Sequence, residues 1–189
     1  MSAFGHSGPL FSIHITRTLK EDNITLRPVR IFDAPFLHYG FASRDFLVAN
    51  GLSKPVASSW FPAWWWTRRT FAFAYCIVVN GKRAGFLGLH TLRPGESAEL
   101  SLSIFEEAMR RKGYGSRAFH LFVHKLEKRS LIKMLLVRVR KDNFTALSFW
   151  KKLGFGEIRR EDAVIVLFYT VRPSQAIPIT DSPAYFQTS

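Results

Sequence analysis

A change in the spacing of apolar residues after position 104 restricts the folds that this chain of 189 residues can adopt. Before that point, three consecutive runs have the alternating or continuously apolar character of strands, and Asn80-Gly81 predicts a hairpin between the first two. After it, apolar residues recur at helical spacing and are followed by another strand-like run. The strand-like runs are residues 71–79, 83–92, 98–104 and 133–140, and the helical run is 115–130. Consecutive strands followed by a strand-helix-strand unit favour a mixed sheet.

The remaining segments extend this sheet on both sides. Residues 23–29 read as a strand in which Pro28 indicates an edge or a strand end, and Asp33 can cap a helix over 34–43. A short helix over 143–154 ends at Gly154, and two further strands follow at 155–160 and 163–171. We therefore predict an α/β (α+β) fold with a mixed, mainly antiparallel twisted central sheet of about seven strands and helices on both faces.

Composition indicates one domain with short tails. We expect an N-terminal tail at 1–21, a domain at 22–172 and a C-terminal tail at 173–189. The sequence shows no secretory signal and no apolar run long enough for a bilayer, so we expect a cytoplasmic protein without membrane association, as a monomer or homodimer. Cys76, the single cysteine, lies in an apolar strand and is predicted to be a buried thiol.

The formal net charge of +13 favours anionic partners. The excess is concentrated in residues 106–160, which hold fifteen lysine or arginine residues and five acids. A phosphate-bearing cofactor, a nucleic acid such as tRNA or a ribosome-bound target all fit this charge. His120 and His124 are four residues apart, but no third ligand accompanies them, so we predict no metal site.

The stretch "RRKGYGSRAF" places two glycines and several cations at a strand-to-helix turn. The first amides of a helix have no intrahelical acceptor and attract anions, and glycine lets the backbone approach a ligand closely. Arg110, Arg111, Lys112 and Arg117 add positive charge to Gly113 and Gly115. The turn is either a phosphate cradle or an ordinary turn with solvated basic side chains. Neither the P-loop motif nor the dinucleotide-binding glycine motif is present.

A second segment distinguishes these interpretations. The turn, with Arg110, Gly113 and Gly115, and the later stretch "DNFTALSFWKKLGF" together resemble the GNAT superfamily of acyl-coenzyme A-dependent N-acyltransferases. The resemblance covers roughly residues 22–172, and "LRPVRIFDAPFLHY" looks like the branch with ribosomal-protein N-terminal acetyltransferases. The second stretch contributes Asn143, Ala146, Lys152, Gly154 and Phe155.

This resemblance implies a binding site for acetyl-coenzyme A as co-substrate. In the family, two neighbouring strands splay apart to admit the pantetheine arm, and here these are residues 98–104 and 133–140. The pyrophosphate would lie on the amides of 111–116. The implied cofactor-binding residues are Leu102, Ser103, Ile104, Arg110, Arg111, Lys112, Gly113, Tyr114, Gly115, Ser116, Asn143 and Trp150.

The resemblance also implies direct attack of an amine on the thioester. Glu99 matches a family glutamate that accepts the proton of the amine, although it can equally be an exposed strand residue without a role. The sequence departs from the family pattern at Trp150. The family commonly has a tyrosine at this position that protonates the leaving sulfur, and an indole cannot act as this acid. Water, Ser148 or another hydroxyl can replace it, or the protein binds the cofactor without catalysis.

The acceptor is an amine of unknown identity: a protein N-terminus, a lysine or a small molecule. Trp64 and Trp65 lie in a stretch that lines the acceptor pocket in the family, and His90 can face the same site. Core packing for the tryptophans and a structural role for His90 remain alternatives. The function predicted is therefore an N-acetyltransferase, with a basic nucleic-acid-associated protein and a non-catalytic acyl-coenzyme A binder as alternatives.

Overall fold

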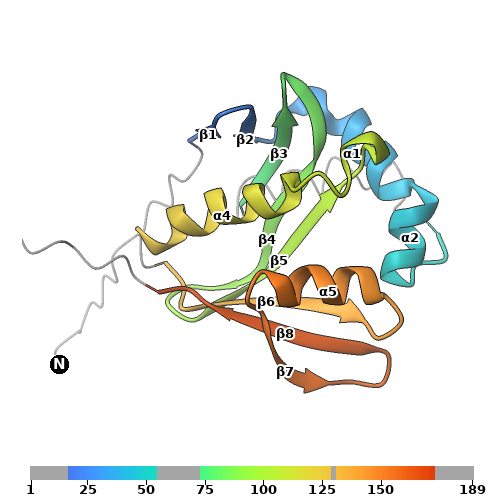
Figure 1. Cartoon of the computed structure of the whole chain (residues 1–189), viewed down its shortest axis with the longest axis vertical. Coiled ribbons are helices and arrows are strands. Elements are labelled where there is room, and N and C mark those ends of the chain that lie inside the picture. Colours follow the sequence, from blue (N-terminus) through green and yellow to red (C-terminus); the bar gives the residue numbers. More distant parts are fainter. Residues whose placement is uncertain (1–16, 55–72, 129–130, 173–189) are drawn as a thin grey trace, which may run out of the picture.

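The computed structural model describes residues 17–54, 73–128 and 131–172. These residues form one eight-stranded sheet in the order β1-β2-β3-β4-β5-β6-β8-β7 (Figure 1). Neighbouring strands are antiparallel except β5 and β6, which are parallel. This confirms the mixed, mainly antiparallel sheet that the sequence predicts. The strands are β1 (Leu19–Glu21), β2 (Ile24–Pro28), β3 (Ala74–Val79), β4 (Lys82–Arg93), β5 (Ser97–Ile104), β6 (Met134–Arg140), β7 (Gly156–Arg160) and β8 (Val164–Thr170).

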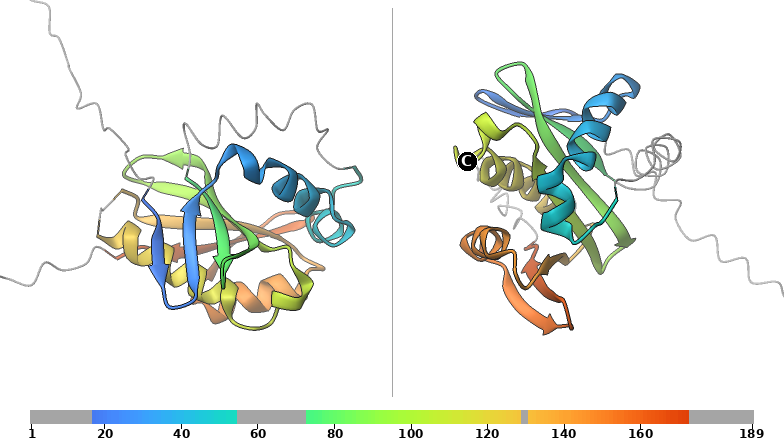
Figure 2. Two further views of the ribbon diagram at one scale, coloured as in Figure 1. Left: turned by 90° about the horizontal axis from the view of Figure 1, so that it is seen from above. Right: turned by 90° about the vertical axis from the view of Figure 1, so that its right-hand side faces the viewer.

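Helices lie on both faces of the sheet, as predicted (Figure 2). Because successive residues of a strand point to opposite faces, β3 contributes to two cores. Tyr75 and Ile77 belong to the larger core with α4 and α5, whereas Cys76 belongs to a smaller core with Leu37 of α1. The helices described are α1 (Ala34–Ala42), α2 (Arg44–Asn50), α4 (Tyr114–Glu127) and α5 (Phe144–Lys152), with 3₁₀ turns η1 (Ile31–Asp33) and η3 (Glu107–Met109).

Several local predictions are confirmed. Asn80 and Gly81 have φ values of +49° and +77° in the turn between β3 and β4, which is the backbone that favours this dipeptide. Pro28 ends β2, and Gly154 follows α5 with φ of +90°. Cys76 is fully buried, and burial raises its pKa to about 12, so the thiol stays protonated at neutral pH.

The start of α1 corrects one prediction. Asp33 occupies the N-cap position, but its side chain makes no capping hydrogen bond to the helix. Its carboxylate instead accepts two hydrogen bonds from the guanidinium of Arg27, at 2.6 and 2.7 Å, and one from the amide of Arg30 at 2.8 Å. Asp33 is 2% exposed, so this bidentate pair joins β2 to the turn before α1 inside the protein.

The helix predicted over 34–43 is confirmed as α1, and a second helix that was not predicted follows it. Ser43 is extended, and its hydroxyl accepts a hydrogen bond from the amide of Phe46, which starts a second helix, α2. Gly51, with φ of +66°, ends it. The strand β1 is a further addition, since it lies within the segment 1–21 that the sequence analysis assigned to a tail. No helix among the described residues is long and apolar enough to cross a membrane.

Candidate active site

The sheet opens between its two parallel strands. β5 and β6 are paired from Ser97 and Met134 to Glu99 and Leu136, and no pairing continues beyond that point (Figure 1). A cleft of about 1190 Å³ occupies the gap. Its walls come from 100–105 and 137–139, the turn before α4 and the start of α4, one side of α5, and Ser43 at the N-cap of α2 with Asp45, Phe46, Ala49 and Asn50 on α2. The two predicted strands therefore splay, and the gap leaves one backbone edge of each without a partner strand in the part of the chain that the structure describes.

The glycine turn lies at one end of this cleft. Arg111 and Gly113 both have left-handed backbone, with φ values of +60° and +79°, and Gly113 is the residue before α4. Within the described residues, the amides of 111–116 donate to no protein acceptor, and Arg117 is the first whose amide does so, to the carbonyl of Gly113. Free amides at a helix N-terminus, arranged by left-handed residues, form an anion-binding concavity.

The two glycines of the turn differ in backbone conformation and in the space around the position of a Cβ. Gly113 needs its left-handed φ, and open space surrounds the position that a Cβ would take. Gly115 has no such φ, but a Cβ there would lie 3.4 Å from side-chain atoms of Leu102 and Phe149. This is an ordinary contact distance, so the protein packing around α4 leaves room for a Cβ at Gly115. A close approach of a ligand to this glycine remains a prediction.

Arg110 holds the wall of the cleft in place. Its guanidinium donates to the carbonyls of Ile104 and Phe105 at 3.0 and 3.1 Å and pairs with Asp45 of α2 at 2.6 Å. The charge predicted to face a phosphate is thus shared with a carboxylate, and the side chain fastens the end of β5 to α2. Lys112 is exposed and lies outside the cleft wall.

Asn143 joins the opposite wall to α2. Its Oδ1 accepts the amide of Ala146 at 3.0 Å and so caps α5, while its Nδ2 donates to the carbonyl of Ala49 at 3.3 Å. Asn143 lines the cleft as the sequence analysis expected, but both ends of its amide already have protein partners. Its clearest function in this structure is to position α5 against α2.

Trp150 lines the cleft and is 6% exposed. Its ring lies edge-on to Phe149 and Phe155, both at 4.9 Å between centroids, and to Phe119 at 6.2 Å. Such edge-to-face contacts stabilise a rigid wall. The indole is therefore a packing residue beside the cleft, which agrees with the inference that it is not an acid.

Glu99 and His90 lie together beside the inner end of the cleft, next to its wall. Leu100 and Leu102 pack in the larger core, so alternation directs Glu99 and Ser101 to the face on which α1 and α2 lie. Glu99 is directly opposite His90 across the β4–β5 ladder, and its Oε2 lies 3.5 Å from Nδ1 of the imidazole. Nε2 lies 2.8 Å from the hydroxyl of Ser101, which lines the cleft.

The structure brings most of the residues predicted to bind the cofactor to one cleft and leaves others apart. Glu99 and His90 are adjacent to the wall rather than part of it. Trp64 and Trp65 lie outside the described residues. Sequence reasoning missed Ser101 and all the α2 residues, although Ser43 and Gly51 are cap signals that would have indicated the second helix. Among the described residues, no cluster of three or more histidine, cysteine or acidic side chains suits a metal ion.

A mixed sheet opened between parallel strands, with free amides at the start of the following helix, is the arrangement that the resemblance to the GNAT superfamily predicts. Residues 42–155 match the family described as the acetyltransferase (GNAT) family. This match extends over more than half of the chain, so the protein belongs to the GNAT acetyltransferase family. A search of curated proteins found no match.

Solved structures share this fold at low sequence identity. One is RimL, a ribosomal L7/L12 alpha-N-protein acetyltransferase in complex with coenzyme A, with 14% identity, a TM-score of 0.70 and coverage of 84% of this chain and 100% of that chain. A spermidine N-acetyltransferase from Vibrio cholerae with coenzyme A and spermine has 14% identity, a TM-score of 0.70 and coverage of 80% and 97%. The Escherichia coli ribosomal-protein-S18-alanine N-acetyltransferase has 20% identity, a TM-score of 0.61 and coverage of 80% and 96%.

Proposed function

We propose that the protein transfers an acetyl group from acetyl-coenzyme A to a primary amine by direct attack in a ternary complex. The observation that carries this proposal is the cleft between β5 and β6, which ends at the unpartnered amides of 111–116. These amides suit the diphosphate of coenzyme A, because a helix N-terminus attracts negative charge. The unpaired edges of the two strands offer hydrogen bonds to the amides of a pantetheine arm.

The chemistry would take place where the cleft reaches the inner end of the gap. An amine nitrogen forms a bond to the thioester carbonyl carbon, the carbon–sulfur bond breaks, and the thiol leaves. A backbone N–H near Leu102 or Ser103, which line the cleft, would polarise the carbonyl oxygen. Water supplies the proton of the leaving sulfur, because Trp150 has no acidic proton to give. The amine loses its own proton towards the face of β5 that carries Glu99.

The related structures name two kinds of acceptor, a ribosomal-protein N-terminus and a polyamine. For this chain we propose the broader class of primary amines. The test is calorimetry with coenzyme A followed by acetyl transfer to a panel of N-terminal peptides, lysine peptides, polyamines, aminoglycosides and charged tRNA. Coenzyme A binding with turnover of one class supports the proposal. Binding without turnover of any acceptor would favour a non-catalytic acyl-coenzyme A-binding protein, and no binding would refute both.

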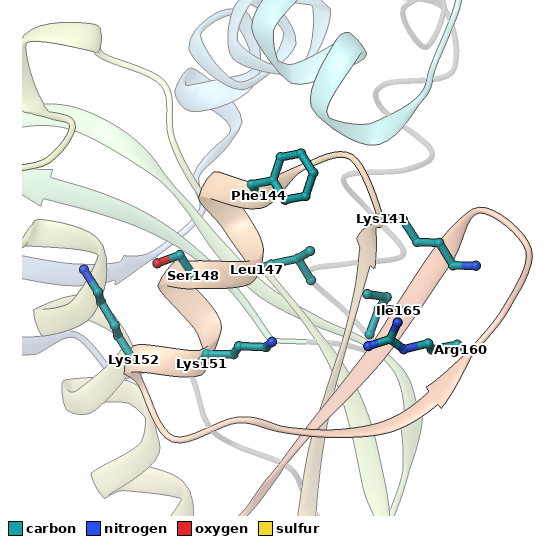
Figure 3. Close-up of a pocket in the computed structure, with 8 residues that line it drawn as sticks. All are labelled: Lys141, Phe144, Leu147, Ser148, Lys151, Lys152, Arg160 and Ile165. Carbon is teal, nitrogen blue, oxygen red and sulfur yellow. The ribbon is translucent and has the colours of Figure 1, made fainter.

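A second candidate function, nucleic-acid binding, is favoured by a basic groove of about 700 Å³ between α5 and the β7–β8 hairpin (Figure 3). In Figure 3, Lys141, Lys151 and Arg160 surround this space, whereas Lys152 extends to the other side of α5. Among the described residues, none that lines the groove is acidic. The complete lining is Lys141, Phe144, Leu147, Ser148, Lys151, Lys152, Arg160 and Ile165.

The groove combines charge with an exposed aromatic ring. Arg160 pairs with Glu157, whereas Lys141 and Lys151 form no ion pair with any described residue. Phe144 is 76% exposed beside them. Cations that follow a phosphate backbone and an aromatic ring that stacks on a base are the elements of single-stranded nucleic-acid sites.

This candidate is tested by fluorescence anisotropy of a short single-stranded RNA at several salt concentrations. The double variant Lys141→Glu/Lys151→Glu should weaken binding and reduce the slope of log affinity against log salt by roughly 1.4, about 0.7 for each lost phosphate contact. The control Lys20→Glu/Lys82→Glu removes the same net charge from exposed sites on other strands. Equal weakening by both variants would show that net charge alone attracts the RNA and would refute a site at the groove.

A further inference from the structure

Three polar side chains at the inner end of the cleft form a continuous array. The imidazole of His90, on β4, stands between Glu99 and Ser101, both on β5. Nδ1 is 3.5 Å from Oε2 of Glu99, and Nε2 is 2.8 Å from Oγ of Ser101. The side chains of His90 and Glu99 are 27% and 23% exposed, so they are partly shielded from solvent but accessible to protons. A carboxylate, an imidazole and a hydroxyl are therefore aligned in that order.

The partners of His90 determine its tautomer. We assign the hydrogen of the neutral imidazole to Nδ1, because this nitrogen faces a carboxylate, which can only accept hydrogen bonds. With this assignment Nε2 has a free lone pair, and the hydroxyl of Ser101 donates to it. Among the described residues, Glu99 is the carboxylate within ion-pair distance of His90. The Glu99 carboxylate therefore lies next to the positive charge that the ring carries once Nε2 accepts a proton.

The position of the array links it to the cleft. Glu99 is the last β5 residue paired to β6, and Ser101 follows two residues later on the same face, where the strands have parted. Ser101 lines the cleft, whereas Glu99 and His90 do not. A proton that leaves a group in the cleft can therefore reach the imidazole through the Ser101 hydroxyl, while the Glu99 carboxylate is farther along the array.

We propose that His90 is the proton acceptor of the reaction, that Ser101 conducts the proton from the cleft, and that Glu99 positions the imidazole. This inference rests on the proposed acetyl transfer. One proton of the substrate ammonium passes to the Ser101 hydroxyl as the hydroxyl proton passes to Nε2, and the imidazolium later releases it to water. The free amine then forms the carbon–nitrogen bond. As the carbon–sulfur bond breaks, the second amine proton is lost and the sulfur is protonated through water.

The kinetic test compares two histidine variants. His90→Gln keeps a hydrogen-bonding side chain next to Ser101 but cannot accept a proton, so it should lower kcat by about 100-fold or more while coenzyme A affinity changes by less than about twofold. His120→Gln, at an exposed position on α4, is the matched control and should leave kcat unchanged. Ser101→Ala should lower kcat by roughly tenfold, because water replaces the hydroxyl less effectively.

The role of Glu99 needs a measurement that a merely structural residue would not change. Nitrogen-15 spectra of the imidazole should show the hydrogen on Nδ1 in the unmodified protein and a mixture of both tautomers in Glu99→Gln, because an amide can donate as well as accept. The same variant should lower kcat by about tenfold without changing KM for acetyl-coenzyme A. An unchanged tautomer in Glu99→Gln would refute the positioning role.

The outcomes separate this inference from the proposed function. Acetyl transfer that continues in His90→Gln at more than about a third of the original kcat would refute the imidazole as proton acceptor and leave the transferase proposal intact. Failure of the unmodified protein to bind coenzyme A would refute the transferase proposal, and the inference with it. Thermal unfolding of each variant verifies that the fold is retained.

Discussion

Strand β5 is paired over most of its length with one neighbour and over only a few residues with the other. On one side β4 is paired with β5 from Ser97 to Ile104, with one irregularity near His90, whereas on the other side pairing with β6 ends at Glu99. On the closed side, Gly85 allows a very close approach, because a Cβ there would lie 2.1 Å from the carbonyl oxygen of Ser103. The end of β5 is therefore held against β4, and this leaves the cleft open towards β6.

The comparison predicts that stability and ligand binding can be separated. The closed side comprises β1 to β5 with α1, and the open side is the cleft between β5 and β6. Changes to the closed side should lower the free energy of unfolding, and changes to the glycine turn should lower coenzyme A affinity. Variants of each kind test this division.

The largest change is expected in the free energy of unfolding when Asp33, on the closed side, is replaced. Burial opposes its ionisation, but the hydrogen bonds from Arg27 and Arg30 hold the pKa of Asp33 below its usual value. Asp33→Asn removes the charge that Arg27 needs and should lower the free energy of unfolding by roughly 3 kcal/mol at neutral pH. Urea unfolding measures this loss, and calorimetry should find coenzyme A affinity unchanged.

The same pair predicts a pH dependence. Because the pKa of Asp33 is lower in the folded than in the unfolded state, its contribution is complete above the unfolded value of about 4 and decreases as the pH falls below it. The stability difference between the unmodified protein and Asp33→Asn should therefore narrow in acid. A difference that stays constant from pH 6 to pH 3 would contradict this account.

Gly85→Ala should be an exception to this division, because it should lower both the free energy of unfolding and coenzyme A affinity. The added methyl group cannot fit beside the Ser103 carbonyl without a backbone shift, so we expect a loss of about 2 kcal/mol in the free energy of unfolding. Because the shifted strand also forms the cleft wall, coenzyme A affinity should fall as well. Gly81→Ala, at a turn position with no atom near the Cβ, gives a comparison in which affinity is retained.

On the open side, Gly113→Val should weaken coenzyme A binding by more than tenfold, or about 1.4 kcal/mol. A β-branched residue resists the φ of +79° that orients the free amides. Gly115→Ala, two residues away, adds a methyl group at ordinary contact distance and should change affinity by less than about threefold. Calorimetry on the two folded variants measures this difference in coenzyme A affinity. Equal losses of affinity would show that the left-handed backbone at Gly113 does not determine coenzyme A binding.

Substitution of Trp150 by another aromatic residue should give the smallest effect, which is measured as turnover. Trp150→Phe keeps an aromatic ring against Phe119, Phe149 and Phe155 and should lower turnover by no more than about tenfold. Trp150→Tyr supplies a phenol and should at least equal the Phe variant. Loss of all turnover in Trp150→Phe, with stability and coenzyme A affinity unchanged, would show that the indole N–H is required and that water is not sufficient.

Most features of the fold that could be predicted depend on sequence signals of a few neighbouring residues. The Asn80-Gly81 turn, the end of β2 at Pro28 and the stop of α5 before Gly154 each depend on the backbone preferences of one or two residues. Strand β1 was missed because it has only three residues and no buried one, so it carries no apolar pattern. Helix α2 was missed because none of its seven residues is buried, so it carries no apolar stripe that marks a helix packed on a core.

The sequence by itself determined the order of the elements and the glycine turn, since alternation, helical spacing and glycine preferences act within a few residues. It could not decide what partners each side chain would have, because these contacts join segments far apart in the chain. Arg110 binds Asp45 of α2, and His90 meets Glu99 and Ser101 only through the register of β4 on β5. Which face of a strand a residue occupies is settled by packing of the whole sheet, and that packing placed Glu99 beside an imidazole.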